Sequence, residues 1–141
     1  DATKDIDNLN EEVDALIAAR GLEIDMLESI SRVLFGTDVS KVSTAELKRD
    51  VLVFARTEPR EFLNVLNDPM LKLQAKIHLF FDEGLLSLRK NRKEVWFSTK
   101  SNKKRMLVVP YGEDPYFMVA SFFTSDDGIE SLKMLESILE G

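Results

Sequence analysis

The spacing of apolar residues changes along the chain, and this change constrains the fold more than any other feature of the sequence. Up to residue 84 and again from residue 115, apolar residues recur every three or four positions, which is typical of helices that bury one face. Between residues 86 and 97 they alternate with their neighbours, and residues 106–109 form a more continuous apolar run, both of which are typical of strands. The sequence therefore predicts a helix-rich α+β fold with a small antiparallel β-hairpin sheet of two or three strands.

Residues 1–36 are predicted to form an acidic, N-terminal helical arm. The arm is either one long helix or two helices that break near Gly21. Its apolar stripe is narrow and has acidic flanks, so we expect it to pack on a partner helix, either in its own core or in another chain. The residues expected in this partner-helix contact are Leu9, Val13, Leu16, Leu27 and Ile30.

Three short helices are predicted between residues 43 and 84. Ser43 and Glu46 form a capping box, in which each side chain satisfies a free backbone amide at the start of a helix. The next two helices begin at Pro59 and Pro69, because proline fits the first turn of a helix.

Two further helices are predicted in residues 110–141, after the sheet. Asp114 and Pro115 have the order of an N-cap and a first helical residue, and Gly128 precedes the last amphipathic helix. We expect these C-terminal helices to pack on a central domain formed by residues 43–109.

The composition disfavours most enzyme classes. There is no cysteine, and His78 is the only histidine, so the usual nucleophile–base pairs and cysteine-based metal sites are absent. Acidic pairs lie at predicted helix ends, where capping explains them. We therefore expect a non-enzymatic binding module with no catalytic residue, no metal and no cofactor.

Positive charge is concentrated in one short segment of an otherwise acidic chain. The chain has a net charge of −6, whereas residues 89–105 carry eight basic residues and one acid, Glu94. The chain is thus not a generally basic nucleic-acid binder, but one with a localised basic stripe. We expect the turns of the sheet to present most of this charge as one nucleic-acid or anion-binding surface. Its residues are Arg89, Lys90, Arg92, Lys93, Lys100, Lys103, Lys104 and Arg105.

The basic segment has three interpretations. Lysine and arginine on a hairpin attract phosphates, and Trp96, which should point to the opposite sheet face from Val95 and Phe97, is the candidate for stacking on a base. Alternatively, the basic residues only prevent edge-to-edge pairing of exposed strands, and Trp96 fills the core. In the third interpretation the segment contacts an acidic protein surface, within this fold, in a homo-oligomer or in another protein.

The order of the predicted elements resembles that of a winged helix. Residues 43–109 contain three short helices, then "DEGLLSL", then the wing-like "RKNRKEVWF". The resemblance implies nucleic-acid binding or protein–protein contact, since winged helices serve both. On the third helix, Lys72 and Lys76 would support phosphate binding, but lysines discriminate little between bases, so we expect no strong sequence specificity.

A longer pattern is similar to that of small uncharacterised proteins of tailed bacteriophages. It comprises "VLVFARTEPREFLNVLND", "LVVPYGEDPYFMVASFF" and "DDGIESLKMLESIL". This resemblance implies a viral setting and an alternative function, that of a structural or assembly protein of a phage particle. No signal peptide and no membrane span is expected, and the expected location is the cytoplasm or a phage particle.

Overall fold

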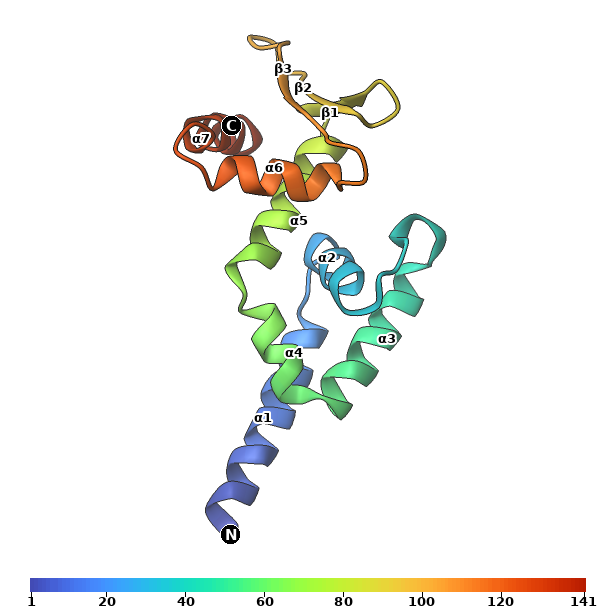
Figure 1. Ribbon diagram of the computed structural model, residues 1–141. Coiled ribbons are helices and arrows are strands. Elements are labelled where there is room, and N and C mark those ends of the chain that lie inside the picture. Colours follow the sequence, from blue (N-terminus) through green and yellow to red (C-terminus); the bar gives the residue numbers. More distant parts are fainter. The chain divides into compact units, whose positions relative to one another are not determined.

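The computed structural model describes all residues, 1–141, and confirms the prediction of a helix-rich α+β fold with a small antiparallel sheet (Figure 1). The helices are α1 (Ala2–Arg20), α2 (Ile24–Phe35), the short 3-10 helix η1 (Val39–Lys41), α3 (Thr44–Thr57), α4 (Pro59–Leu66), α5 (Pro69–Asp82), α6 (Pro115–Phe123) and α7 (Ile129–Glu140). The strands are β1 (Leu86–Arg89), β2 (Glu94–Phe97) and β3 (Arg105–Val108). No helix has the length and apolar character needed to cross a membrane.

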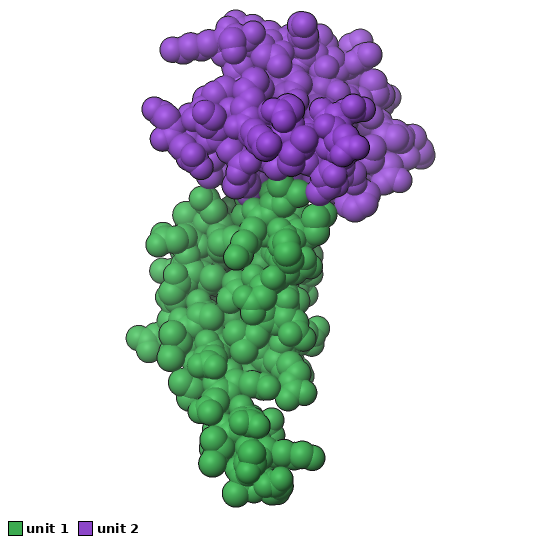
Figure 2. All heavy atoms as spheres, turned by 90° about the vertical axis from the view of Figure 1, so that its left-hand side faces the viewer, with its two compact units in different colours: residues 1–75 green, residues 76–141 purple.

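The chain forms two compact units, and the boundary between them lies between Ala75 and Lys76, within α5 (Figure 2). This division differs from the predicted segments 1–36, 43–109 and 110–141. The N-terminal arm belongs to the first unit because α1 contacts α3 and α4. The boundary falls inside the predicted winged-helix-like segment, whose helices α3 and α4 lie in the first unit and whose strands lie in the second.

The core of the first unit is formed by one face each of α1 to α4. Ala15 and Ala19 are the buried residues of α1, and their small side chains allow its backbone to approach α3 and α4 closely. Leu27 and Ile30 bring α2 into the same core, and Phe62 of α4 is fully buried there. Of the two predicted forms of the N-terminal arm, the structure has two helices separated near Gly21.

The helix ends follow from local hydrogen bonding. Ser43 caps α3, because its side chain accepts a hydrogen bond of 3.2 Å from the backbone N–H of Glu46. Pro59 and Pro69 are the first residues of α4 and α5, as predicted from the missing N–H of proline. Gly84, with a φ of +76°, follows α5 and turns the chain towards β1.

In the second unit, the sheet has the strand order β1-β2-β3 and both pairs are antiparallel. Leu86, Val95 and Phe97 are buried, whereas Trp96, between the last two, is half-buried and lies on the opposite face. The rings of Phe80 in α5 and Phe123 in α6 pack edge to face, with centroids 6.1 Å apart. The sheet therefore has one face in the core and one face that carries polar side chains.

A register shift between β2 and β3 positions Arg105. Val95 faces Leu107 and Trp96 faces Arg105, which leaves Met106 as an extra residue in β3. Such a bulge re-aims the side chains that follow or precede it. Here it puts Arg105 directly opposite Trp96, on the polar face of the sheet.

Gly128 is required by a close approach of backbone rather than by an unusual φ. A Cβ atom at this position would lie 1.8 Å from the backbone oxygen of Phe122, whereas a Cβ at Gly21 would lie 3.6 Å from its nearest neighbour.

We expect Gly128→Ala to lower the free energy of unfolding by about 1–3 kcal/mol, the usual cost of overpacking. Gly21→Ala should have a much smaller effect. Urea unfolding followed by circular dichroism compares the two, and equal stabilities would contradict the packing described here.

Candidate functional site

The two turns of the sheet, one at each end of β2, carry most of the eight predicted basic residues. The first turn, residues 90–93, joins β1 to β2, and the second, residues 98–104, joins β2 to β3. All eight side chains are exposed, and we call them the hairpin surface. They are Arg89, Lys90, Arg92, Lys93, Lys100, Lys103, Lys104 and Arg105.

Most of the positive charge on the hairpin surface has no carboxylate partner. Only Lys90 and Arg105 form ion pairs, and both pair with the same residue, Glu94. In the rest of the chain, six of the eleven lysines and arginines are paired with an acid. The hairpin surface is thus a concentration of unpaired positive charge in an acidic protein.

Glu94 is the centre of the polar face of the sheet. Its side chain is only 8% exposed and lies 3.1 Å from Nη1 of Arg105 and 3.9 Å from Nζ of Lys90. The indole Nε1 of Trp96 donates a hydrogen bond of 3.0 Å to its other carboxylate oxygen. This hydrogen bond lowers the pKa of Glu94 below its ordinary value of 4.5, burial opposes the shift, and Arg105 and Lys90 add to the lowering.

Trp96 forms a cationic and aromatic platform together with Arg89. The guanidinium carbon of Arg89 lies 4.3 Å from the centroid of the indole ring, within the range of a cation–π contact. The hydrogen bond to Glu94 fixes the indole from its edge. The alternative in which Trp96 fills the core does not describe this position, because Val95 and Phe97 are the residues of β2 that enter it.

The first turn holds three consecutive residues in the left-handed region. Lys90, Asn91 and Arg92 have φ values of 56°, 56° and 67°. Asparagine tolerates this region, but each of the other two residues costs about 1 kcal/mol or more there. The arrangement places Lys90 near Glu94 and the guanidinium of Arg92 at 5.8 Å from the ring centroid of Tyr116 in α6.

The second turn presents lysines from a backbone that is held by hydrogen bonds of Thr99 and Asn102. Thr99 donates its N–H to the carbonyl of Asn102 at 3.0 Å, and its hydroxyl accepts from the N–H of Asn102 at 2.9 Å. The side chain of Asn102 in turn accepts from the N–H of Lys104 at 3.1 Å. Lys100, Lys103 and Lys104 therefore project from a defined turn, and their ammonium groups remain open to solvent.

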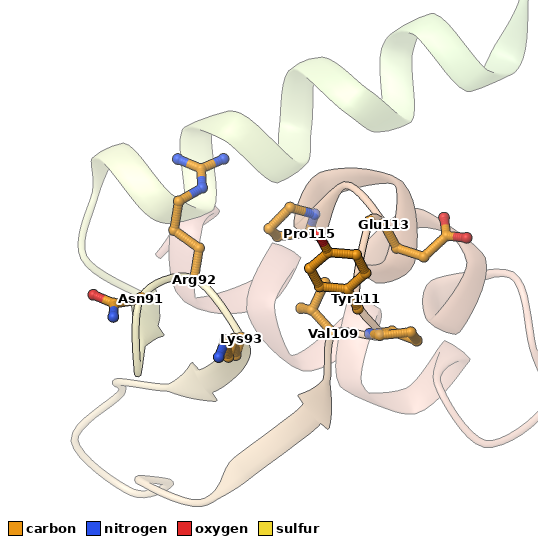
Figure 3. A pocket seen from close by; sticks show the side chains of 9 residues that line it. Asn91, Arg92, Lys93, Val109, Tyr111, Glu113 and Pro115 are labelled. Atoms are coloured by element: carbon orange, nitrogen blue, oxygen red, sulfur yellow. The ribbon is translucent and has the colours of Figure 1, made fainter.

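A pocket of about 410 Å³ adjoins the first turn (Figure 3). Asn91, Arg92 and Lys93 form one side of it, and the segment from Val109 to Pro115 forms the other. The two sides are joined where the N–H of Val109 donates to the carbonyl of Lys93 at 2.7 Å.

The two supporting lysines of α5 differ in their surroundings. Lys76 is half-buried and paired with Glu136 of α7, so its charge is already neutralised. Lys72 is exposed and belongs to the first unit.

The predicted partner-helix contact divides into two parts. Leu27 and Ile30 are buried in the core of the first unit, so for these two residues the structure has the alternative of a contact within the chain's own core. The reason is that α2 packs on α3 within the same chain. Leu9 and Val13 are 58% and 53% exposed, and Leu16 is half-buried.

Three residues of the site were not predicted. Glu94 was visible as the only acid in the basic segment, and strand alternation would have placed it on the same face as Trp96. Tyr111 and Glu113 line the pocket, but the sequence around them indicates only the end of the sheet.

No protein-family model, curated protein or solved structure matches the chain. The structure contains no group of three or more histidine, aspartate or glutamate residues that could hold a metal ion. The winged-helix and phage resemblances therefore stay predictions, and the function has to be argued from the site itself.

The depressed pKa of Glu94 makes the stability of the second unit depend on pH. Because the folded-state pKa is below 4.5, the ionised carboxylate stabilises the fold above that pH, and this stabilisation is lost as the pH falls through the folded-state value. Glu94→Gln should lower stability at neutral pH, and its difference from the wild type should shrink on acidification to about pH 3.

Urea unfolding followed by the fluorescence of Trp96, the only tryptophan, measures this difference. Glu83→Gln is the matched control, since Glu83 is exposed and forms no ion pair. If the wild type and Glu94→Gln differ by the same amount at every pH, the charge of Glu94 does not have the role described here.

Proposed function

We propose that the protein is a non-enzymatic module that binds the nucleic-acid backbone through the hairpin surface, without strong sequence specificity. The observation that carries the proposal is the exposure of eight basic side chains, six of them without an acidic partner, around one small sheet. Phosphate contacts dominate non-specific binding to nucleic acids, and each neutralised phosphate releases counterions. The unpaired side chains meet this requirement without breaking an internal ion pair.

The residue types on the hairpin surface support backbone contact more than base readout. Lysines on flexible stems are point charges that bind phosphates, whereas base recognition uses fixed bidentate geometry. Trp96 and Arg89 add a flat cationic surface on which an unpaired base can stack whatever its identity.

The acidic first unit supports a localised mode of binding. It carries fifteen acidic and nine basic residues, whereas residues 89–105 of the second unit carry one acid and eight bases. Phosphates are repelled by the first unit and attracted by the hairpin surface, so the electrostatic field orients the chain on an anionic strand.

The charge-reversal variant Lys100→Glu, Lys103→Glu, Lys104→Glu tests the proposal. These side chains form no ion pair, so the variant should fold, whereas reversing Arg105 would also disturb Glu94. On duplex DNA in a salt series, the log–log slope of the wild type should correspond to several phosphates at about 0.9 each. The variant should lose a slope of about 1–3 and bind at least about tenfold more weakly at low salt.

The matched control reverses Lys4, Lys48 and Arg56, which are exposed basic residues of the first unit without ion pairs. This control makes the same change in net charge and should retain the wild-type slope. Absence of binding by the wild type even at low salt would remove nucleic acid as the partner.

A second candidate function is supported by a different observation, the uncovered face of α1. The first ten residues of the chain are exposed, and the end of α1 extends beyond the other helices of its unit (Figure 1). Ile6, Leu9, Val13 and Ile17 form an apolar stripe on α1, each more than half exposed. Residues spaced by three and four positions lie on one helix face, which is the pattern of a helix that docks on a partner.

The acidic residues of α1 favour the basic hairpin surface of a second copy as the proposed partner of this helix. The helix α1 carries Asp5, Asp7, Glu11, Glu12 and Asp14, so pairing with another α1 would bring like charges together. The hairpin surface has the opposite charge, and contact between it and α1 of the next copy would be heterologous. Such head-to-tail contact builds rings or filaments, which is the kind of contact expected of a structural or assembly protein of a phage particle.

Replacing Leu9 and Val13 by serine tests this second function. If copies associate through α1, the double variant should be monomeric at concentrations where the wild type is oligomeric, and salt should also dissociate the wild type. The mass in solution, measured by light scattering after gel filtration, reports both effects. Val33→Ser with Val53→Ser is the control, since these valines are exposed elsewhere in the same unit. A wild type that stays monomeric at all concentrations excludes assembly through α1.

A further inference from the structure

The pocket beside the first turn has walls of different chemistry. One wall carries the cations Arg92 and Lys93, neither of which forms an ion pair. The opposite wall carries the ring of Tyr111 and the carboxylate of Glu113, which also forms no ion pair (Figure 3). The volume of about 410 Å³ is within the range of pockets that hold small ligands.

Arg92 is positioned from two directions. Its backbone lies in the left-handed region, with a φ of 67°, and its guanidinium approaches the ring of Tyr116, with 5.8 Å between the guanidinium carbon and the ring centroid. Tyr116 is itself stacked on His78, with ring centroids 4.0 Å apart. Arg92 thus lines the pocket with its guanidinium beside Tyr116.

Tyr111 is fully exposed, at 103% of its reference area, and no aromatic side chain packs on its ring. A ring with both faces open is available for stacking on a planar ligand. The adjoining Glu113 can accept a hydrogen bond from an amino group, as acidic side chains do from the N4 amino group of cytosine.

We propose that this pocket binds one unpaired nucleotide, with its phosphate at Arg92 and Lys93, its base on Tyr111 and the amino group of the base at Glu113. The inference deepens the proposed nucleic-acid function and rests on it, because the nucleotide would belong to the bound strand. A base that is paired in a duplex does not present a free face to Tyr111, so the pocket gives the protein a preference for single strands. The amino group distinguishes cytosine from thymine, which has a carbonyl oxygen in that position.

A titration of the full chain with deoxycytidine monophosphate, followed by backbone amide NMR, tests the pocket without a polymer. The amide signals of residues 91–93 and 109–113 should shift. Tyr111→Ala should weaken binding at least about fivefold, as expected for the loss of one stacked base. Phe117→Ala, which removes an exposed aromatic ring of α6 outside the pocket, should leave the affinity unchanged.

Further ligands separate the parts of the site. Deoxycytidine without phosphate should bind more weakly to the wild type, and Lys93→Ala should remove most of the difference between the two ligands. Thymidine monophosphate should bind more weakly than deoxycytidine monophosphate, and Glu113→Ala should reduce this preference.

The outcomes distinguish the pocket from the hairpin surface. The proposed nucleotide site would be rejected if the amide signals of residues 91–93 and 109–113 did not shift, or if the wild type and Tyr111→Ala bound the nucleotide equally well. Either result would reject it even if duplex DNA binds with a steep salt dependence. Nucleotide binding that depends on Tyr111, without any binding of duplex or single-stranded DNA, would support the pocket and reject the proposed backbone function.

Discussion

The carboxylate of Glu94 is the only acidic group among the eight basic residues of the hairpin surface, and it is buried beside two of them, Lys90 and Arg105. It joins all three strands of the sheet: it is on β2, its partner Arg105 is on β3, and Lys90 follows β1. The same carboxylate fixes the indole of Trp96 through Nε1. Unpartnered, a buried carboxylate would be costly; here Trp96 and Arg105 donate hydrogen bonds to it, and Lys90 forms a longer ion pair. The polar face of the sheet depends on this one acid, because its charged neighbours, Lys90 and Arg105, are cations that repel one another.

The distribution of charge links the two proposed functions. Both use the hairpin surface, in one case for phosphates and in the other for the acidic helix α1 of a second copy. The two partners would compete for the same lysines, since a side chain that neutralises a phosphate is not available to a carboxylate. Assembly and nucleic-acid binding would then exclude each other at any one hairpin surface.

The sequence predicted the helix ends well, because each depends on residues a few positions away, as at Ser43, Pro59 and Gly84. The sequence could not predict that Leu27 is buried and Leu9 is exposed. Both residues have helical spacing, and only tertiary packing decides which of them enters the core. The pocket also could not be predicted from neighbouring residues in the sequence. Its walls come from two segments that meet through the hydrogen bond between Val109 and Lys93. Residues close together in the sequence are enough to predict a helix or a strand. A site formed by distant segments can be predicted only when the arrangement of those segments in space is known.

The three left-handed residues of the first turn have a consequence for the stability of the fold. Glycine enters this region freely, so a chain selected for stability alone would have glycine in a turn of this conformation. Positions 90–92 instead hold Lys90, Asn91 and Arg92. Two cations thus stand at positions where they reduce the stability of the fold relative to glycine. The side chains that carry the proposed binding would therefore be held at a cost to the stability of this turn.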